Sequence, residues 1–260
     1  MAPEAVLTED KTKVETILVS QPEPESEKSP YHLLAKKFKL EIDFRPFIQI
    51  EGLSPKEFRK SRIIITDYSA IVLTSRTAID HFFRICDELR VRLSQEIKYF
   101  CISEAIALYL QKYIQYRKRK VFYGNGGTLK ELKEVMLKYR ERENILYLCS
   151  DIRKNQIPEM LEENNFDYTK AVIYRTVPSD LSDLSDIKYD MIVFFSPAGV
   201  MSLFKNFPDF KQGNTKIAAF GPATCNQVIE AGLRLDVQAP IPEARSMPSA
   251  IENYITSTGS

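Results

Sequence analysis

The sequence is poor in the residues that build metal and nucleophile sites. Its 260 residues include two histidines, His32 and His81, which lie far apart in the chain. The four cysteines are Cys86, Cys101, Cys149 and Cys225. None belongs to a CxxC pair, whereas a tetrahedral zinc site usually shows clustered Cys and His. We therefore expect no metal site, and four small buried thiols in a reducing cytoplasm.

Several motifs of nucleotide-binding proteins and hydrolases are also missing. No segment matches GxGxxG or GxxxxGK[ST], which excludes a Rossmann dinucleotide site and a P-loop. No serine stands in GxSxG, and the two histidines give no credible catalytic triad.

The chain also lacks a strong net charge and a long apolar run. Its formal charge is +1, so we expect no general attraction to nucleic acid or to a membrane surface. No apolar run approaches the roughly 18–20 residues that span a bilayer. The first residues, MAPEAVLTEDKTKVET, have no apolar stretch, so we interpret 1–14 as a flexible leader and not a signal peptide.

One basic run, Arg117-Lys118-Arg119-Lys120, stands between a predicted helix and a predicted strand. Such a run is typical of a solvated helix end favoured by the helix dipole. The alternative is a non-catalytic interaction protein that uses the surface of 113–120. Tight nucleic-acid binding with a steep salt dependence would favour that alternative.

Short β-branched or aromatic runs alternate with segments of helical spacing. IVLTS at 71–75 precedes TAIDHFFRICDEL, and KIAAFG at 216–221 precedes NQVIEAGL. The strand runs are almost continuously apolar, as expected for strands buried on both faces. This alternation predicts an α/β fold with mainly parallel sheets. Two extended segments, 40–53 and 167–179, are not followed by a convincing helix, and we expect them to connect compact units.

An internal repeat is the strongest sign of organisation. Four pairs of segments recur in the same order, at offsets of roughly 120 residues, and predict a duplicated α/β unit. The segment from Glu15 matches the one from Glu143, 71–83 matches 192–204, 98–110 matches 216–228, and 127–136 matches 246–255.

Strand-to-helix turns are the candidate ligand sites, because ligands of open α/β sheets bind beyond the carboxyl ends of strands. Free N–H groups at helix starts suit carboxylates or phosphates. Helix capping alone explains each single turn, and Thr128 with Glu131 predicts a capping box. Their repetition in two domains favours a cleft that binds a ligand with many anionic groups. The turns are Thr74-Ser75-Arg76-Thr77, Ser103-Glu104-Ala105, Gly126-Gly127-Thr128, Ser196-Pro197-Ala198-Gly199 and Gly221-Pro222-Ala223-Thr224, with Ser246 opening the helix that matches Thr128.

Tyr174-Arg175-Thr176, FFSPAGV at 194–200, IAAFGPATCNQVIEAGL at 217–233 and APIPEARSMPSAIENYI at 239–255 resemble the uroporphyrinogen-III synthase family of tetrapyrrole biosynthesis. The resemblance implies two similar α/β domains with parallel sheets, joined by a two-stranded antiparallel β-ladder. Domain 1 would comprise 15–40 and 178–257, and domain 2 would comprise 54–166. The linker strands would be 41–53 and 167–177.

The resemblance also implies a reaction. Hydroxymethylbilane, a linear tetrapyrrole with eight carboxylates, would be cyclised to uroporphyrinogen III with inversion of ring D and loss of water. The family needs no metal or cofactor. Tyr174 would be catalytic, helping the terminal hydroxyl to leave. The implied substrate-binding residues are Thr74, Ser75, Arg76, Ser103, Glu104, Ser196, Pro197, Ala198, Gly199, Gly221, Thr224 and Ser246.

Some positions depart from the family pattern, namely Arg76, Ile106 and Ser150. They put the substrate contacts of the N-terminal half in question. The alternative is therefore a catalytically inactive relative that acts as a tetrapyrrole-binding or regulatory module. The resemblance further implies a cytoplasmic monomer that contacts no nucleic acid or membrane. The instability of hydroxymethylbilane makes transient contact with hydroxymethylbilane synthase an additional expectation.

Overall fold

A computed structural model of the chain describes residues 13–152, 156–184 and 188–258. Residues 1–12 of the predicted leader, which spans 1–14, lie outside these ranges. The chain divides into two compact units, which we call unit 1 (Met1–Gln49 with Val177–Ser260) and unit 2 (Ile50–Thr176). No helix within the described ranges is long and apolar enough to cross a membrane.

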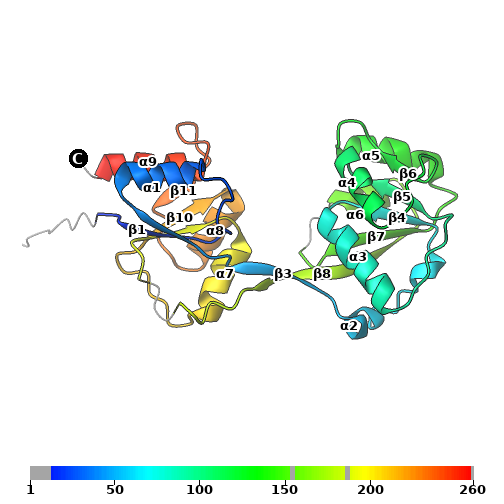
Figure 1. The fold of residues 1–260 in the computed structure, drawn as a ribbon, viewed down its shortest axis with the longest axis horizontal. Coiled ribbons are helices and arrows are strands. Elements are labelled where there is room, and N and C mark those ends of the chain that lie inside the picture. Colours follow the sequence, from blue (N-terminus) through cyan, green and yellow to red (C-terminus); the bar gives the residue numbers. More distant parts are fainter. Residues whose placement is uncertain (1–12, 153–155, 185–187, 259–260) are drawn as a thin grey trace, which may run out of the picture. The chain divides into compact units, whose positions relative to one another are not determined.

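Unit 1 is built on a parallel five-stranded sheet with strand order β11-β10-β9-β1-β2. Figure 1 shows α1 and α9 side by side along this sheet. Successive side chains of each strand point to opposite faces. Ile17 and Val19 pack with α1 and α9, and Leu18 between them packs with α7 and α8. The elements are β1 (Thr16–Val19), α1 (Pro30–Phe38), β2 (Glu41–Phe44), β9 (Met191–Phe194), α7 (Pro197–Asn206), β10 (Lys216–Phe220), α8 (Pro222–Glu230), β11 (Val237–Ala239) and α9 (Met247–Thr258).

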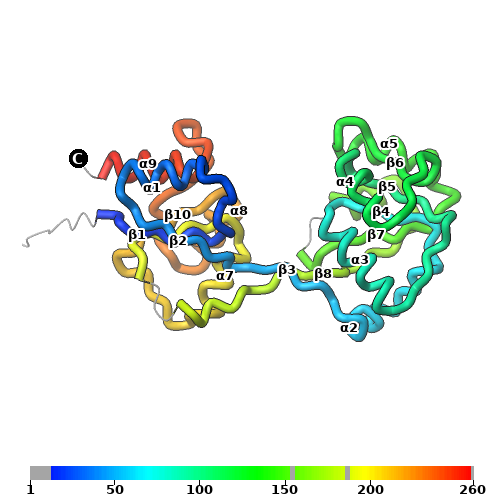
Figure 2. Tube along the Cα trace, viewed as in Figure 1, coloured from blue at the N-terminus to red at the C-terminus, as the bar shows by residue number. Residues whose placement is uncertain are grey.

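The first and last helices of the chain pack against each other in unit 1. Figure 2 shows α1, near the start of the trace, beside α9 at its end, and residues of the two helices are in contact. Segments about 200 residues apart in sequence therefore share one hydrophobic core.

Unit 2 contains a six-stranded sheet with strand order β3-β8-β7-β4-β5-β6. The pairs from β8 to β6 are parallel. The elements are β3 (Ile48–Gly52), α2 (Pro55–Arg59), η1 (Ile65–Asp67), β4 (Ala70–Leu73), α3 (Arg76–Glu88), β5 (Lys98–Cys101), α4 (Glu104–Tyr109), η2 (Leu110–Lys112), β6 (Val121–Tyr123), α5 (Leu129–Met136), η3 (Leu137–Tyr139), β7 (Ile145–Ser150), α6 (Gln156–Glu163) and β8 (Tyr168–Pro178).

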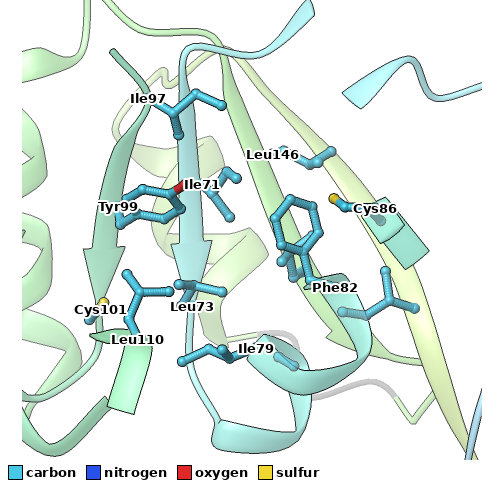
Figure 3. Packing of buried hydrophobic residues seen from close by; sticks show 14 of the residues in the cluster. Ile71, Leu73, Ile79, Phe82, Cys86, Ile97, Tyr99, Cys101, Leu110 and Leu146 are labelled. Carbon is cyan, nitrogen blue, oxygen red and sulfur yellow. The ribbon is translucent and has the colours of Figure 1, made fainter. Parts of the chain in front are cut away.

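Helices cover both faces of this sheet. On one face, Ile71 and Leu73 of β4 pack with Ile79 and Phe82 of α3, as Figure 3 shows. On the other face, Val72 packs in a cluster with residues of α5 and α6. All four cysteines of the chain are buried free thiols, and the predicted capping box of Thr128 and Glu131 is present at the start of α5.

The two sheets have the same topology, which confirms the predicted repeat and the prediction of an α/β fold with mainly parallel strands. The order β2-β1-β9-β10-β11 corresponds to β8-β7-β4-β5-β6. The matched segments of the sequence repeat hold the matched strands, because Glu15 precedes β1 and Glu143 precedes β7.

The predicted linker segments contribute to the sheets. Residues 41–44 form β2, which pairs with β1, and residues 168–174 of β8 pair with β7. β3 and β8 are neighbours, and backbone hydrogen bonds join Leu53 N to Ile173 O and Ser179 N to Phe47 O. The antiparallel linker ladder and the domain boundaries stay predictions.

Candidate functional site

The sheet of unit 2 reverses its direction of winding between β4 and β7. From β4 the chain moves outward through β5 to β6, and from β7 it moves the other way to β8. The helices that follow β4 and β7 pack on opposite faces, since α3 and α6 belong to different core clusters. Such a reversal leaves a crevice beyond the carboxyl ends of the strands, where open α/β sheets bind ligands.

A cavity of about 580 Å³ lies at this place, within the size range of small-molecule sites. Its walls combine apolar side chains with hydroxyl, thiol and amide groups and one amine. Thr74, Ser75 and Tyr174, all predicted from sequence, are brought together here. The lining residues are Ile50, Thr74, Ser75, Ile102, Leu129, Tyr147, Cys149, Ser150, Ile152, Gln156, Ile157, Lys170, Tyr174 and Thr176.

The start of α3 adjoins the cavity, whose lining includes Ser75. Ser75 is the N-cap, and its Oγ accepts a hydrogen bond of 3.0 Å from the N–H of Ala78. The N–H groups of Arg76 and Thr77 precede the first intrahelical bond and have no partner inside the helix. Together with the dipole of this 13-residue helix, they favour an anion at this position.

A β-bulge determines where Tyr174 points. The β7–β8 register shifts after Cys149, which faces Val172, so that Ser150 faces Tyr174. Ile173 is the extra residue, and it is fully buried. Strict alternation would place Tyr174 on the same face as Val172, but Ile173 and Tyr174 both pack on the face covered by α3. Bulges commonly re-aim a side chain in this way near active sites.

His81 of α3 supports the Tyr174 ring. The two rings stack with centroids 5.6 Å apart and an interplanar angle of 26°. A Cβ added to Gly52 would lie 2.4 Å from Nδ1 of His81, so the absence of a side chain at Gly52 makes room for the imidazole. Burial lowers the pKa of His81, and the charge of Arg84 lowers it further, against the opposing effect of Asp80.

Among the described residues that line the cavity, Lys170 is the one with a charged side chain. It is half-buried on β8, opposite Tyr147 of β7. The nearby Cys149 donates from Sγ to the carbonyl of Ala171, at 3.6 Å. Burial raises the pKa of the Cys149 thiol to about 11, which Lys170 partly opposes, so this cysteine is a thiol and not a nucleophilic thiolate at neutral pH.

Arg76, Ser103 and Glu104 of unit 2 do not line this cavity. Arg76 is exposed, and its guanidinium lies 5.2 Å from the centre of the Tyr109 ring. Ser103 is the N-cap of α4 without a capping hydrogen bond from its side chain. The carboxylate of Glu104 accepts a hydrogen bond of 3.1 Å from the hydroxyl of Tyr123.

In unit 1, the equivalent reversal lies between β1 and β9, and the predicted turn after β9 is there. The Oγ of Ser196 accepts a hydrogen bond of 3.1 Å from the N–H of Gly199 and caps α7. Pro197 and Ala198 form the first positions of this helix. A Cβ on Gly199 would lie 3.8 Å from Oγ of Ser20, which follows β1, so the two strand ends are close.

The other predicted residues of unit 1 lie at helix starts further along the sheet. Gly221 precedes α8 with a φ of 86°, a conformation that favours glycine. Thr224, one turn later, is 2% exposed. Ser246 accepts a hydrogen bond of 3.3 Å from the N–H of Ser249 at the start of α9. It also lines a hollow of about 230 Å³ between α1 and α9.

Sequence reasoning missed Lys170, His81 and the apolar walls formed by Ile50 and Ile152. A lysine directly before the apolar run Ala171-Val172-Ile173, four residues before the candidate tyrosine, was the available signal for Lys170. Nothing in the sequence indicated the bulge that brings Tyr174 to His81. Ser150, a departure from the family pattern, lines the cavity, and Ile106, another, is buried in the core. Among the described residues, no group of His, Cys, Asp or Glu could hold a metal ion.

Comparison with known proteins gives a consistent result. The family described as uroporphyrinogen-III synthase HemD matches residues 29–248. The chain is 25% identical over 151 residues to uroporphyrinogen-III synthase of Saccharomyces cerevisiae, covering 50% of this chain and 54% of that protein. It is 22% identical over 236 residues to the enzyme of the same name from Schizosaccharomyces pombe, covering 85% and 90%.

A solved structure shares the fold. The crystal structure of uroporphyrinogen-III synthetase from Helicobacter pylori aligns with a TM-score of 0.54 and 15% identity, covering 94% of this chain and 99% of that chain.

Proposed function

Because the chain belongs to the uroporphyrinogen-III synthase family, which matches residues 29–248, we propose that it cyclises hydroxymethylbilane to uroporphyrinogen III with inversion of ring D and release of water. The observation that carries this proposal is the cavity of unit 2. It joins a tyrosine hydroxyl, the N-cap serine of α3 and a lysine amine among apolar side chains. These groups complement pyrrole rings that bear carboxylates.

Tyr174 is the proposed catalytic residue. Its hydroxyl donates a hydrogen bond or proton to the terminal hydroxyl of the substrate, the carbon–oxygen bond breaks, and water leaves. The resulting azafulvene cation closes through a spiro intermediate that inverts ring D, and the ring loses a proton when aromaticity returns. The proton donated at the start is therefore recovered at the end, and the only by-product is water.

Substrate orientation is the second part of the proposed mechanism. Helix amides can bind carboxylates without requiring many Lys or Arg residues. We assign this role to Thr74 and Ser75 with the first amides of α3, where the helix dipole favours anions. Holding a flexible bilane in a closing conformation removes several kcal/mol from the barrier by orientation.

The remaining predicted contacts lie at helix starts of the two units. The turns at Ser196–Gly199 and at Gly221, with Ser246, present helix N-termini that suit carboxylates. For Thr224 the backbone N–H is the better candidate than the buried side chain. Arg76 is exposed and free to reach an anion, whereas Glu104 would repel one. Since the reaction is redox-neutral, we propose no cofactor.

We also propose that the protein acts as a cytoplasmic monomer. Four free, buried thiols support a reducing compartment. Transient contact with hydroxymethylbilane synthase is proposed because hydroxymethylbilane closes without an enzyme to the type I isomer, so that direct transfer would protect it. Light scattering of the purified protein, alone and mixed with that synthase, tests both statements.

An isomer assay tests the function itself. Hydroxymethylbilane is generated in place, the protein is added, and the cyclised products are oxidised and separated as type I and type III porphyrins. We expect type III to dominate in proportion to the protein added. Type I alone, from folded protein in a tube where a second cosynthase works, would instead favour the inactive tetrapyrrole-binding relative.

A further inference from the structure

Lys170 differs from three other partly buried cations of unit 2, namely Lys98, Lys120 and Arg175. The amine of Lys98 contacts the carboxylate of Glu143 at 2.5 Å, and that of Lys120 contacts Glu96 at 2.5 Å. Arg175 binds two carboxylates, from Glu51 and Glu57, at 2.7 and 2.9 Å. The side-chain amine of Lys170 has no ion pair or hydrogen bond within residues 13–152, 156–184 and 188–258, whereas its backbone belongs to the ladder with β7.

The surroundings of this amine are mostly apolar. It shares the cavity with Tyr147, Cys149 and Ile157, and other hydrogen-bonding groups in the wall are neutral. Withdrawing an ammonium from water costs free energy unless an anion or hydrogen bonds compensate. A half-buried, unpaired amine in such a cavity is therefore complementary to an anion that enters it.

Two further side chains suggest what carries that anion. Ile50 and Ile152 both line the cavity, and they remain 53% and 51% exposed. Large apolar side chains that stay exposed at a concave site commonly contact a ligand. An apolar wall beside a single cation matches a flat, partly apolar ring with an acidic side chain.

We propose that Lys170 binds one carboxylate side chain of a pyrrole ring of the substrate, an assignment that rests on the function proposed above. The amine forms a charge-assisted hydrogen bond with the carboxylate. The ring bearing it packs against Ile50 and Ile152. Tyr174 lies on the same strand and lines the same cavity, so this contact anchors the substrate in the cavity that holds the catalytic hydroxyl.

Lys170 is a substrate-positioning residue and does not take part in bond breaking. Its contact is present before and during the reaction, so its loss weakens binding of the substrate and of the transition state equally. That makes KM the affected quantity and leaves kcat nearly unchanged.

Steady-state kinetics of type III formation test the proposal with Lys170→Met, Lys170→Arg and the control Lys138→Met. Lys138 is an exposed residue of η3 that does not line the cavity. Loss of one charge-assisted hydrogen bond predicts about a tenfold rise in KM for Lys170→Met. Lys170→Arg keeps the charge and should recover most of that loss. Lys138→Met should match the wild type.

A salt titration adds a second readout. Added NaCl should raise the KM of the wild type more than that of Lys170→Met, because one partly screened ion pair is already gone from the variant. A KM that Lys170→Met leaves unchanged, in a wild type that forms type III product, overturns the role of Lys170 and leaves the proposed function intact.

An inactive wild type would overturn the proposed function. In that case a direct binding measurement would decide whether Lys170 forms an anion site. Fluorescence titration with uroporphyrin III, a stable porphyrin with eight carboxylates, then measures the Kd of each variant. A Kd about tenfold weaker for Lys170→Met supports a carboxylate site at Lys170. Equal Kd values reject it. Lys170→Gln replaces Lys170→Met where thermal melting shows that the latter has lost its fold.

Discussion

The two units repeat one topology, but their matched strand pairs differ in register. In unit 1, Val19 of β1 faces Phe44 of β2, and in unit 2 the equivalent Tyr147 of β7 faces Lys170 of β8. Phe44 packs edge-on against Tyr31 of α1, with ring centroids 5.5 Å apart. Lys170 takes the corresponding place and borders a cavity. Equivalent strands thus border aromatic packing in one unit and a cavity in the other.

The second difference is the bulge. β1 and β2 pair without interruption over four residues, whereas β7 and β8 shift register at Cys149 and Ser150. β8 is also longer than the equivalent β2, with 11 residues against four. Two local changes in one strand therefore distinguish the units, and they place Tyr174 and Lys170 at the reversal of the sheet. A duplicated sheet supplies the scaffold, and irregularity in one copy supplies the site.

The largest expected effect comes from removing the group that unit 2 alone contributes. Tyr174→Phe should lower kcat for type III formation by about a hundredfold, as expected for loss of a general acid, and leave the fold intact. Tyr168→Phe is the matched control, because Tyr168 lies on the same strand and donates to exposed Glu162 at 2.6 Å. Unchanged turnover in Tyr174→Phe would remove Tyr174 from the mechanism.

Helix caps test what the units share. Ser75 and Ser196 cap α3 and α7 with hydrogen bonds of 3.0 and 3.1 Å. Ser75→Ala and Ser196→Ala should each lower the free energy of unfolding by about 1 kcal/mol, measured by urea denaturation. Ser103→Ala should change it by less than about 0.5 kcal/mol, since the Ser103 side chain makes no capping bond. If Ser103→Ala lowered the free energy of unfolding as much as the other two substitutions, the assignment of side-chain caps to Ser75 and Ser196 alone would be wrong.

The smallest effect concerns the pH dependence of unit 2. The pKa of His81 is lowered in the folded state, mainly by burial, so the unfolded chain takes up the proton first as the pH falls. The contribution of His81 to stability is complete above the unfolded pKa of about 6.5 and is lost progressively below it. Urea denaturation at pH 7.5 and 5.5 should therefore show a smaller pH dependence for His81→Phe, which keeps the ring stack. An equal or larger dependence would mean that His81 is not the titrating group.

The fold was largely predictable, because its determinants are local. Continuous apolar runs such as MIVFFS specify strands buried on both faces, and their alternation with helical segments specifies parallel pairing. The repeat was visible because both copies must bury the same pattern of side chains. Register was less accessible, since shifting a strand by two residues keeps its side chains on the same faces and leaves no trace in the hydrophobic pattern.

The site was predictable only in part. Turn residues such as Ser75 and Ser196 follow from capping chemistry, which acts over three residues. Tyr174 came from the resemblance to a family and not from its spacing. Glu104 and Arg76, two of the predicted substrate-binding residues, do not line the cavity of unit 2, and their side chains contact Tyr123 and Tyr109. Side-chain direction at the end of a helix depends on neighbours from other elements.

The sequence by itself determined the α/β class, the duplication, the capped turns and the family, because each is encoded in short segments or in their order. The tertiary structure decided which turns meet at one cavity, where the extra residue of β8 lies, and that the Lys170 side chain borders this cavity. Those properties depend on pairing between segments distant in the chain, such as Tyr147 with Lys170 and His81 with Tyr174. Burial and electrostatic pairing in three dimensions, rather than local preference, settle such contacts.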